Sequence, residues 1–259
     1  MIRGIDHLVI AVPELEKAAA GYRELGFTVV PGGRHPVGTH NALIAFADGS
    51  YLELIAFYRD NPRHRWWDVL EAGGGLVDYC LRTDNLAADT RALRAAGVDI
   101  AEPVPQSRER PDGVELRWVF SLARGRHRGV APFLIEDETP REERVPRETA
   151  HANRVTGITL LRIATTSAEL PAVRHWYATA LEQAGEDVVN AELGGSGPRF
   201  AVGPNAIEFL GPRLAGGPIA QWVAAHAASP FEAVLRTPTP RFGPLDRERT
   251  AGARLLLAP

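Results

Sequence analysis

The chain contains few of the residues on which several classes of protein depend. Cys80 is the single cysteine among 259 residues, so the sequence excludes an internal disulfide framework and a zinc site built from several cysteines. One cysteine is typical of a reducing compartment, and we therefore expect a cytoplasmic protein.

An excess of charge of one sign is also lacking. The 29 Lys and Arg residues against 32 Asp and Glu residues leave a formal net charge of −3. No overall field would hold a polyanion, so nucleic acid is not expected as a partner.

Long apolar runs are absent as well. The longest uncharged run, Leu214 to Phe231, contains Gly, Pro, Gln, His and Ser, and the apolar start of the chain is interrupted at Asp6-His7. We expect neither a membrane span nor a signal peptide. The glycine run at Gly194 to Gly197 lacks the following Lys and Ser or Thr of a phosphate loop, so no nucleotide cofactor is expected.

The residues that are present predict two rounds of strands and a helix. In the first round, the strand Ile5 to Val12 precedes a helix that begins after Glu14, and Asp48-Gly49 joins two strands, Ala42 to Ala47 and Tyr51 to Phe57. The segments of the second round are a strand Leu76 to Thr83, Asp84 as N-cap of a helix Asn85 to Ala96, a short strand Asp99 to Val104, and strands Val114 to Leu122 and Ala131 to Glu136. Glu138 to Arg154 is charged and aperiodic, which indicates a linker.

Beyond this linker the pattern of the first half returns. Tyr51-Leu52-Glu53-Leu54-Ile55 is matched by Ala206-Ile207-Glu208-Phe209-Leu210, an offset of 155 residues, and the same offset pairs Tyr22 with Tyr177. We infer an internal duplication with a short second copy. The predicted fold is α+β with tandem βαβββ modules: a domain of two modules at 1–137, a charged linker at 138–154 and a second, abbreviated repeat at 155–259.

These segments resemble the vicinal-oxygen-chelate superfamily, and within it the glyoxalase-like domain proteins of bacteria. The resemblance covers about residues 3 to 137 well and the later half weakly, and its specificity lies in the order and spacing of loose motifs. The motifs are Gly38-Thr39-His40-Asn41, Tyr51 to Ile55, Gly73-Gly74-Gly75-Leu76, Arg110-Pro111-Asp112-Gly113 with Trp118, and Ala131 to Ile135.

The resemblance implies that each pair of modules forms a cup with its functional side chains at the floor. In metal-dependent members, a divalent ion (Fe, Mn, Zn or Ni) bound by His and Glu holds two vicinal oxygens of the substrate. Carried over to this chain, the ligands are His7 and Glu53. The second module departs from the pattern, since Asp78 stands where a second His is expected, and Asp78 is the candidate third ligand.

Other roles follow from the same resemblance. Glu53, or a hydroxide on the metal, is the candidate catalytic base. His40 and Asn41 at the rim of the cup, together with Arg117, are candidate substrate-binding residues.

Each candidate also has a structural interpretation. His7 on an apolar strand could be a core histidine with a hydrogen-bond partner. Glu53 between two leucines needs a partner if it is buried, either a metal with His7, an arginine, or solvent in an open cup. Its repeat equivalent, Glu208, has Arg162 rather than a His on the neighbouring strand, so we expect Glu208 to pair with an arginine or to be exposed.

Three functions are compatible with this pattern. The first is a metal-dependent lyase, isomerase or dioxygenase acting on a small molecule with vicinal oxygens. The second is a metal-free protein of the bleomycin-resistance type that binds or sequesters a small molecule, and the third is a scaffold whose repeat serves mainly to form a homodimer. Fold identity alone cannot choose among them.

Overall fold

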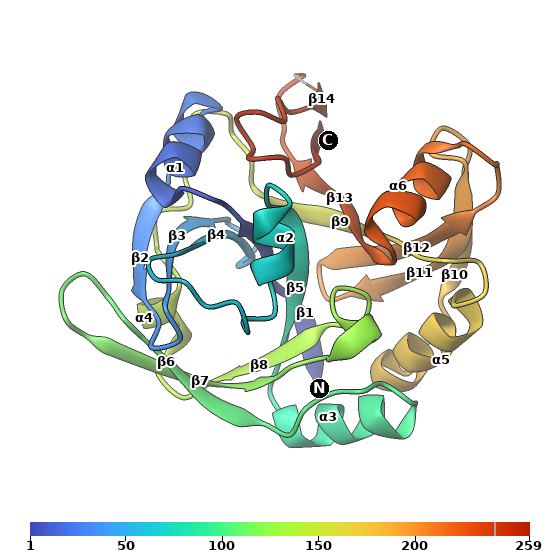
Figure 1. Ribbon diagram of the computed structural model, residues 1–259, viewed down its shortest axis with the longest axis horizontal. Coiled ribbons are helices and arrows are strands. Elements are labelled where there is room, and N and C mark those ends of the chain that lie inside the picture. The colour runs from blue at the N-terminus through green and yellow to red at the C-terminus, as the bar shows by residue number, and fades with distance from the viewer. Residues whose placement is uncertain (241) are drawn as a thin grey trace.

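The computed structural model describes residues 1–240 and 242–259, and its first half contains two rounds of strands and helices (Figure 1). The first round contains β1 (Ile2–Ala11), α1 (Leu15–Glu24), β2 (Val30–Arg34), β3 (Thr39–Ala45), β4 (Tyr51–Phe57) and α2 (Trp67–Glu71). The second contains β5 (Gly75–Thr83), α3 (Leu86–Ala95), β6 (Val104–Glu109), β7 (Glu115–Ser121), a short 3-10 helix (Gly125–His127) and β8 (Phe133–Asp137).

Strands β1 to β8 close into a barrel in the order β1-β4-β3-β2-β6-β7-β8-β5. β1 lies parallel to β4 and antiparallel to β5, so the first strand of the chain joins the two modules of the barrel. The barrel closes between β2 and β6, where Arg34 pairs with Glu109. Gly33 permits this contact, because a Cβ at this position would lie 2.0 Å from the carbonyl oxygen of Glu109.

The second half repeats this order without closing. After the short helix α4 (Arg141–Arg144), which follows the barrel, it contains β9 (Gly157–Ala164), α5 (Leu170–Leu181), β10 (Glu186–Asn190), β11 (Gly195–Val202), β12 (Asn205–Pro212), α6 (Pro218–His226), β13 (Ser229–Arg236), β14 (Gly243–Pro244) and β15 (Leu255–Ala258). Strands β9 to β15 form one sheet in the order β10-β11-β12-β9-β13-β15-β14. β12 lies parallel to β9 as β4 does to β1, and β15 lies parallel to β13 as β8 does to β5.

This arrangement confirms the predicted fold class, an α+β fold of tandem βαβββ modules with a duplicated, shortened second half. Among the described residues, no helix comparable to α3 separates β13 from β14, and the second sheet has two free edges instead of a closed barrel. The described helices also include none that is long and apolar enough to cross a membrane.

The two halves share one hydrophobic core. Side chains from β1 and β5 of the barrel, such as Ile10 and Tyr79, belong to the same buried cluster as Ile163 and Tyr177 of the second half. The hydroxyl groups of Tyr79 and Tyr177 form a hydrogen bond, and Tyr79 donates to the carbonyl oxygen of Val130 at 2.6 Å. The halves are therefore joined by burial of apolar area and by polar contacts within it.

Local signals in the sequence missed the strand β2 and were imprecise elsewhere, for example at two places in the second round. The N-cap of α3 is Asn85 rather than Asp84, and its side chain accepts a hydrogen bond from the backbone of Ala88. The strand expected at Asp99 to Val104 is a single bridge at Ile100, and the strand β6 starts where we expected one to end.

Asn205 makes a testable polar contact between the halves. Its side chain accepts from the backbone nitrogen of Ile5 at 2.8 Å and donates to the carbonyl oxygen of Ile158 at 2.7 Å. We expect Asn205→Ala to lower the free energy of unfolding by about 2 kcal/mol, because it leaves two buried backbone groups without partners. Urea denaturation measures this loss. Val189→Ala, at a side chain that is 64% exposed, should change stability by less than about 0.5 kcal/mol, and an equal loss in both variants would contradict the prediction.

Candidate functional site

A cavity of about 420 Å³ occupies the interior of the barrel. Its polar lining includes His7, His35, Asn41, Glu53, Arg108 and Arg144, and its apolar lining includes Trp66, Trp118, Phe120, Phe133 and Ile135. Volume and composition are those of a site for a small molecule, with few polar groups set in an apolar and aromatic wall.

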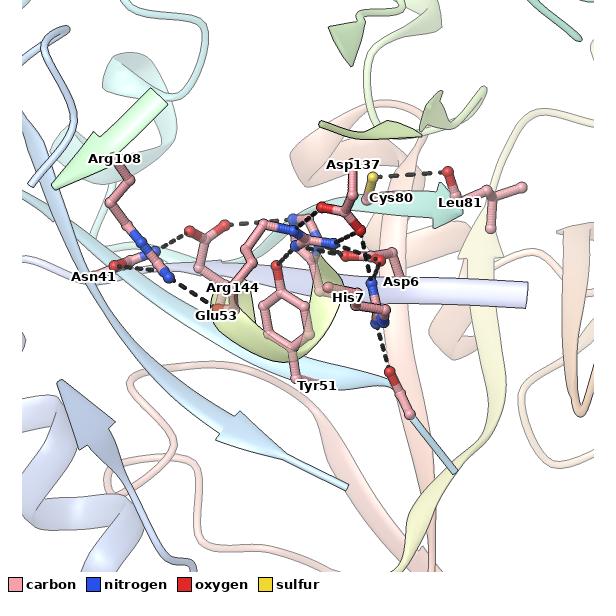
Figure 2. Close-up of polar contacts among 12 residues, drawn as sticks. Asp6, His7, Asn41, Tyr51, Glu53, Cys80, Leu81, Arg108, Asp137 and Arg144 are labelled. Atoms are coloured by element: carbon pink, nitrogen blue, oxygen red, sulfur yellow. Dashed lines mark hydrogen bonds and ion pairs between the residues drawn. The ribbon is translucent and has the colours of Figure 1, made fainter. Parts of the chain in front are cut away.

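At one side of this cavity Asp6 forms a buried ion pair. Its side chain is completely buried on β1, and Arg144 donates to its two carboxylate oxygens at 3.1 and 3.0 Å (Figure 2). Arg141 also donates to Asp6, while Arg144 further pairs with Asp137 and donates to the hydroxyl of Tyr51 at 2.7 Å. Burial opposes ionisation of Asp6, but Arg144, Arg141 and the hydrogen bond from His7 overcome it and hold the pKa of Asp6 well below its ordinary value.

Asp6 orients His7, the next residue. β1 is irregular between Ile5 and His7, and the Nδ1 atom of His7 lies 2.7 Å from the Asp6 carboxylate. An ionised carboxylate only accepts hydrogen bonds, so we assign the ring proton to Nδ1. The ring stacks on Tyr51 at 4.6 Å between centroids, and its other nitrogen, Nε2, lies 3.4 Å from Oε2 of Glu53.

Glu53 on β4 is 7% exposed and is the carboxylate among the residues that line the cavity. Its Oε1 atom accepts from the side-chain amide of Asn41 at 2.5 Å, and Oδ1 of Asn41 accepts from Arg108 at 3.3 Å. The partners of Glu53 are therefore His7 on one side and Asn41 on the other (Figure 2). This arrangement fixes an imidazole and a carboxylate, two groups that can exchange protons, next to each other in the cavity.

The structure brings His7, Glu53 and Asn41 together and places Asp78 elsewhere. Asp78 on β5 is completely buried and is not among the residues that line the cavity. Its carboxylate accepts from Arg65 at 2.6 Å and from the indole of Trp66 at 3.1 Å. Asp78 thus anchors the segment between β4 and α2. The residue of β5 opposite His7 is Cys80.

The donors near His7 do not fit the three-ligand face that the resemblance implies. Ligand atoms of Asp6, His7 and Cys80 lie within 4.8 Å of one another and form a geometrically possible metal cluster. However, both oxygens of Asp6 bind arginine, and burial raises the pKa of the Cys80 thiol well above its ordinary value, whereas metals bind the thiolate. The second module contributes Phe133, whose ring lies 5.4 Å from that of His7, where a ligand would be needed. His7 and Glu53 remain as the two donors that face each other.

Two other predicted substrate-binding residues lie outside the cavity lining. Thr39 and Asn41 line the cavity, so the intervening His40 on β3 points to the opposite face of the strand, where its ring contacts Tyr58. Arg117 is exposed on β7 beside the inward-facing Trp118.

Sequence reasoning missed Arg108, Arg144 and His35. Arg144 lies in the segment interpreted as a linker, and its partners Asp6 and Tyr51 are far away in the sequence. The alternation along β7 places Trp118 and Phe120 on one face, and both line the cavity. In the second half, Glu208 pairs with Arg162 at 2.9 Å, which confirms one of the two alternatives expected for it.

Two histidines of the cavity are neutral. Burial, opposed by Glu53 and reinforced by Arg108, lowers the pKa of His35 to about 4, and burial together with Arg65 lowers the pKa of His64 to about 4. Near neutral pH these rings therefore act as uncharged hydrogen-bonding groups.

Comparison with known proteins agrees with this architecture. Residues 5–181 match the model of a family described as a glyoxalase-like domain, so the chain belongs to the glyoxalase-like domain family. No curated protein matches the chain.

Solved structures show the same fold at low sequence identity. A hypothetical protein from Staphylococcus aureus is 12% identical, with a TM-score of 0.71, and the match covers 100% of this chain and 99% of that one. A mutant of 4-hydroxymandelate synthase from Streptomyces coelicolor is 16% identical (TM-score 0.62; 92% and 72% covered). A fusion protein of a xylose isomerase-like TIM barrel and a 4-hydroxyphenylpyruvate dioxygenase is 15% identical (TM-score 0.55; 93% and 37% covered).

The ion pair between Asp6 and Arg144 predicts that replacing Arg144 strongly destabilises the protein. We expect Arg144→Met to lower the free energy of unfolding by about 3–5 kcal/mol, because it leaves a buried carboxylate with too few partners. Tyr51→Phe, which removes one neutral contact of the same guanidinium, should cost about 1 kcal/mol. Chemical denaturation followed by tryptophan fluorescence measures both. A loss below about 1 kcal/mol for Arg144→Met would show that Asp6 does not depend on this cation.

The neutral His35 predicts a pH dependence of stability. Its folded pKa of about 4 lies below the ordinary value of 6.5, so between these values the unfolded chain binds more protons and stability decreases as the pH falls. His35 should contribute a loss of about 2 kcal/mol between roughly pH 7 and pH 5. The difference between wild type and His35→Gln isolates this contribution, with the exposed His175→Gln as control. Equal pH profiles for wild type and His35→Gln would rule it out.

Proposed function

We propose that this protein is an enzyme of the glyoxalase-like kind that performs acid–base chemistry on a small molecule bound inside the barrel. The observation that carries the proposal is the ordered row of contacts from Arg144 through Asp6 and His7 to Glu53. Such a row costs stability, since it buries several charged groups. Burial of these charged groups is not needed to pack the barrel, which favours a functional role for them.

The chemistry follows from what each group can hold. Asp6 fixes the tautomer of His7, so the Nε2 atom of the ring faces Glu53 and the cavity. Glu53 is the group that can take a proton from a bound carbon or oxygen acid, and Asn41 fixes its other oxygen. The unprotonated Nε2 of His7, 3.4 Å away, can then accept this proton from Glu53. Removal of a base such as Glu53 typically costs a factor of 10² to 10⁴ in rate.

Relatives in fold support an enzyme. One neighbour is described as a synthase and another contains a dioxygenase. A dioxygenase is one of the three reaction classes, with lyase and isomerase, that we expected from the sequence.

The metal-dependent alternative would rest on His7 and Glu53. It is favoured by the 3.4 Å distance between Nε2 of His7 and Oε2 of Glu53, since two atoms this close can bind one ion. A bound divalent ion would supply Lewis-acid polarisation of substrate oxygens. The metal-free binding protein is the other alternative, and it predicts binding in the cavity without turnover.

Proton exchange tests the enzyme proposal even when the product of the reaction is not identified. A panel of small hydroxy and oxo acids, and of their neutral analogues, would be incubated with the protein in D2O and followed by proton NMR. We expect exchange or conversion of at least one member, and a loss of about 100-fold or more in Glu53→Gln, because the amide cannot accept the proton.

His40→Gln is the matched control for this experiment. It changes a polar residue on the neighbouring strand β3 that is not among the residues lining the cavity, and it should leave the rate within about twofold. Bound panel members that never exchange, or an equal rate in wild type and Glu53→Gln, would contradict the proposal and favour the binding protein.

A cytoplasmic location and a homodimer stay predictions of the sequence. The single cysteine supports the first, since it is buried and unpaired with another cysteine. Gel filtration with light scattering tests the second.

A further inference from the structure

Arg108 stands out among the buried charges of the barrel. Its side chain lines the cavity from β6 and the residue is 4% exposed, yet it forms no ion pair within the part of the chain that the structure describes. Two other arginines of the lining are neutralised, the half-buried Arg65 by Asp78 and the buried Arg144 by Asp6 and Asp137. The guanidinium of Arg108 is therefore a buried positive charge at the cavity wall that no carboxylate contacts.

The hydrogen bonds of Arg108 are also incomplete. One terminal nitrogen donates to Oδ1 of Asn41 at 3.3 Å and the other to the carbonyl oxygen of Arg144 at 2.9 Å, while Nε has no partner among residues 1–240 and 242–259. Burial lowers the pKa of Arg108, but a guanidinium stays protonated in proteins. Its two hydrogen-bond partners are neutral oxygens, so no carboxylate contacts the guanidinium, and Glu53 acts on it only across Asn41.

The backbone makes room for this arrangement. A Cβ on Gly32 would lie 2.1 Å from Oδ1 of Asn41 and 3.0 Å from a terminal nitrogen of Arg108. Only glycine at this position of β2 leaves space for the contact between the two side chains. The guanidinium of Arg108 is thus held in a fixed position on the wall of the cavity.

The rest of the cavity favours an apolar ligand body. Phe120 packs edge-on against Phe133 with ring centroids 5.3 Å apart, and Trp118 lies 5.7 Å from Phe120. The indole nitrogen of Trp118 is buried and has no hydrogen-bond partner within the described chain, so it is available as a donor. Aromatic walls next to a fixed cation and a free N–H donor suit a ring-bearing anion.

The charges around the cavity indicate that the anion carries a single negative charge. Arg108 is the lining arginine whose charge is buried and uncompensated, and Glu53 is close enough to Arg108 to oppose a second negative charge, since both contact Asn41. A carboxylate matches the planar fork of a guanidinium and carries one charge.

We propose that the barrel binds a small monocarboxylic acid with an apolar, ring-sized body, and that Arg108 is the residue that pairs with its carboxylate. This inference rests on the proposed function in naming the substrate class of the same cavity. Binding of the acid does not require Glu53 to act as a base, so the two proposals can fail separately.

Calorimetric titration tests the proposal with matched pairs of probes. Benzoate, phenylacetate and 3-phenylpropionate would be compared with the corresponding amides and with phenyl phosphate, in a buffer that contains no carboxylate. We expect at least one acid to bind at least tenfold more tightly than its amide. Absence of binding by every acid, equal binding of acid and amide, or tighter binding of phenyl phosphate would each overturn the proposal.

Variants assign the effect to Arg108. Arg108→Gln should weaken binding of the acid by at least tenfold and leave binding of the amide unchanged, whereas Arg117→Gln, at an exposed arginine on β7, should leave both within twofold. Loss of acid binding in Arg117→Gln to the same extent would show an unspecific effect of charge and overturn the assignment.

Stability separates an anchor for a ligand from a structural arginine. Removing an uncompensated buried charge should leave the melting temperature of the ligand-free protein unchanged or raise it. A fall of more than about 5 °C in Arg108→Gln would show that Arg108 supports the fold, and would overturn the proposal.

Glu53→Gln distinguishes the two proposals. It should keep or strengthen binding of the acid, because it removes a negative charge near Arg108, while it abolishes turnover if Glu53 is the base. Acid binding by a wild-type protein that turns over none of the compounds supports the carboxylate site and rejects the enzyme. Turnover of neutral compounds alone by the wild type does the reverse.

Discussion

The buried ion pair between Asp6 and Arg144 is the contact on which the polar side of the barrel depends. Asp6 is enclosed on the first strand, and its counter-charges, Arg144 and Arg141, come from the charged segment that follows the barrel. Because these cations keep Asp6 ionised, its carboxylate can hold His7 in one orientation. His7 in turn presents its second nitrogen to Glu53, so a contact between distant segments of the chain determines the geometry of the candidate reactive pair.

The duplicated module has produced a cavity with two unlike sides. The first module supplies His7, Glu53 and Asn41 to the lining, whereas β8 of the second module supplies Phe133 and Ile135. A symmetric pair of modules would surround an ion from both sides. Here β1 and β4 supply the reactive polar groups and β8 supplies apolar ones, which suits a ligand that has a charged end and an apolar body.

Periodicity predicted the fold and part of the site, because both depend on local pattern. The strand Tyr51–Phe57 was predicted to the residue, since the Asp48-Gly49 turn and its apolar run mark both ends. We expected Asp78 at the floor of the cup, but it does not line the cavity, because β1 is irregular at three points facing β5 and the residue opposite His7 is Cys80. No local pattern reveals such register shifts, nor the pairing of Arg144 with a residue 138 positions earlier.

Elemental analysis of the purified protein tests most directly whether the His7–Glu53 pair exchanges protons, as we propose, or holds a metal, as the alternative requires. The protein would be analysed as isolated and after incubation with Fe, Mn, Zn or Ni, with His7→Ala alongside. We predict no stoichiometric metal in either protein, since the cavity offers two facing donors among several guanidinium groups. One equivalent of metal in the wild type that disappears in His7→Ala would contradict the account and make the pair a metal site.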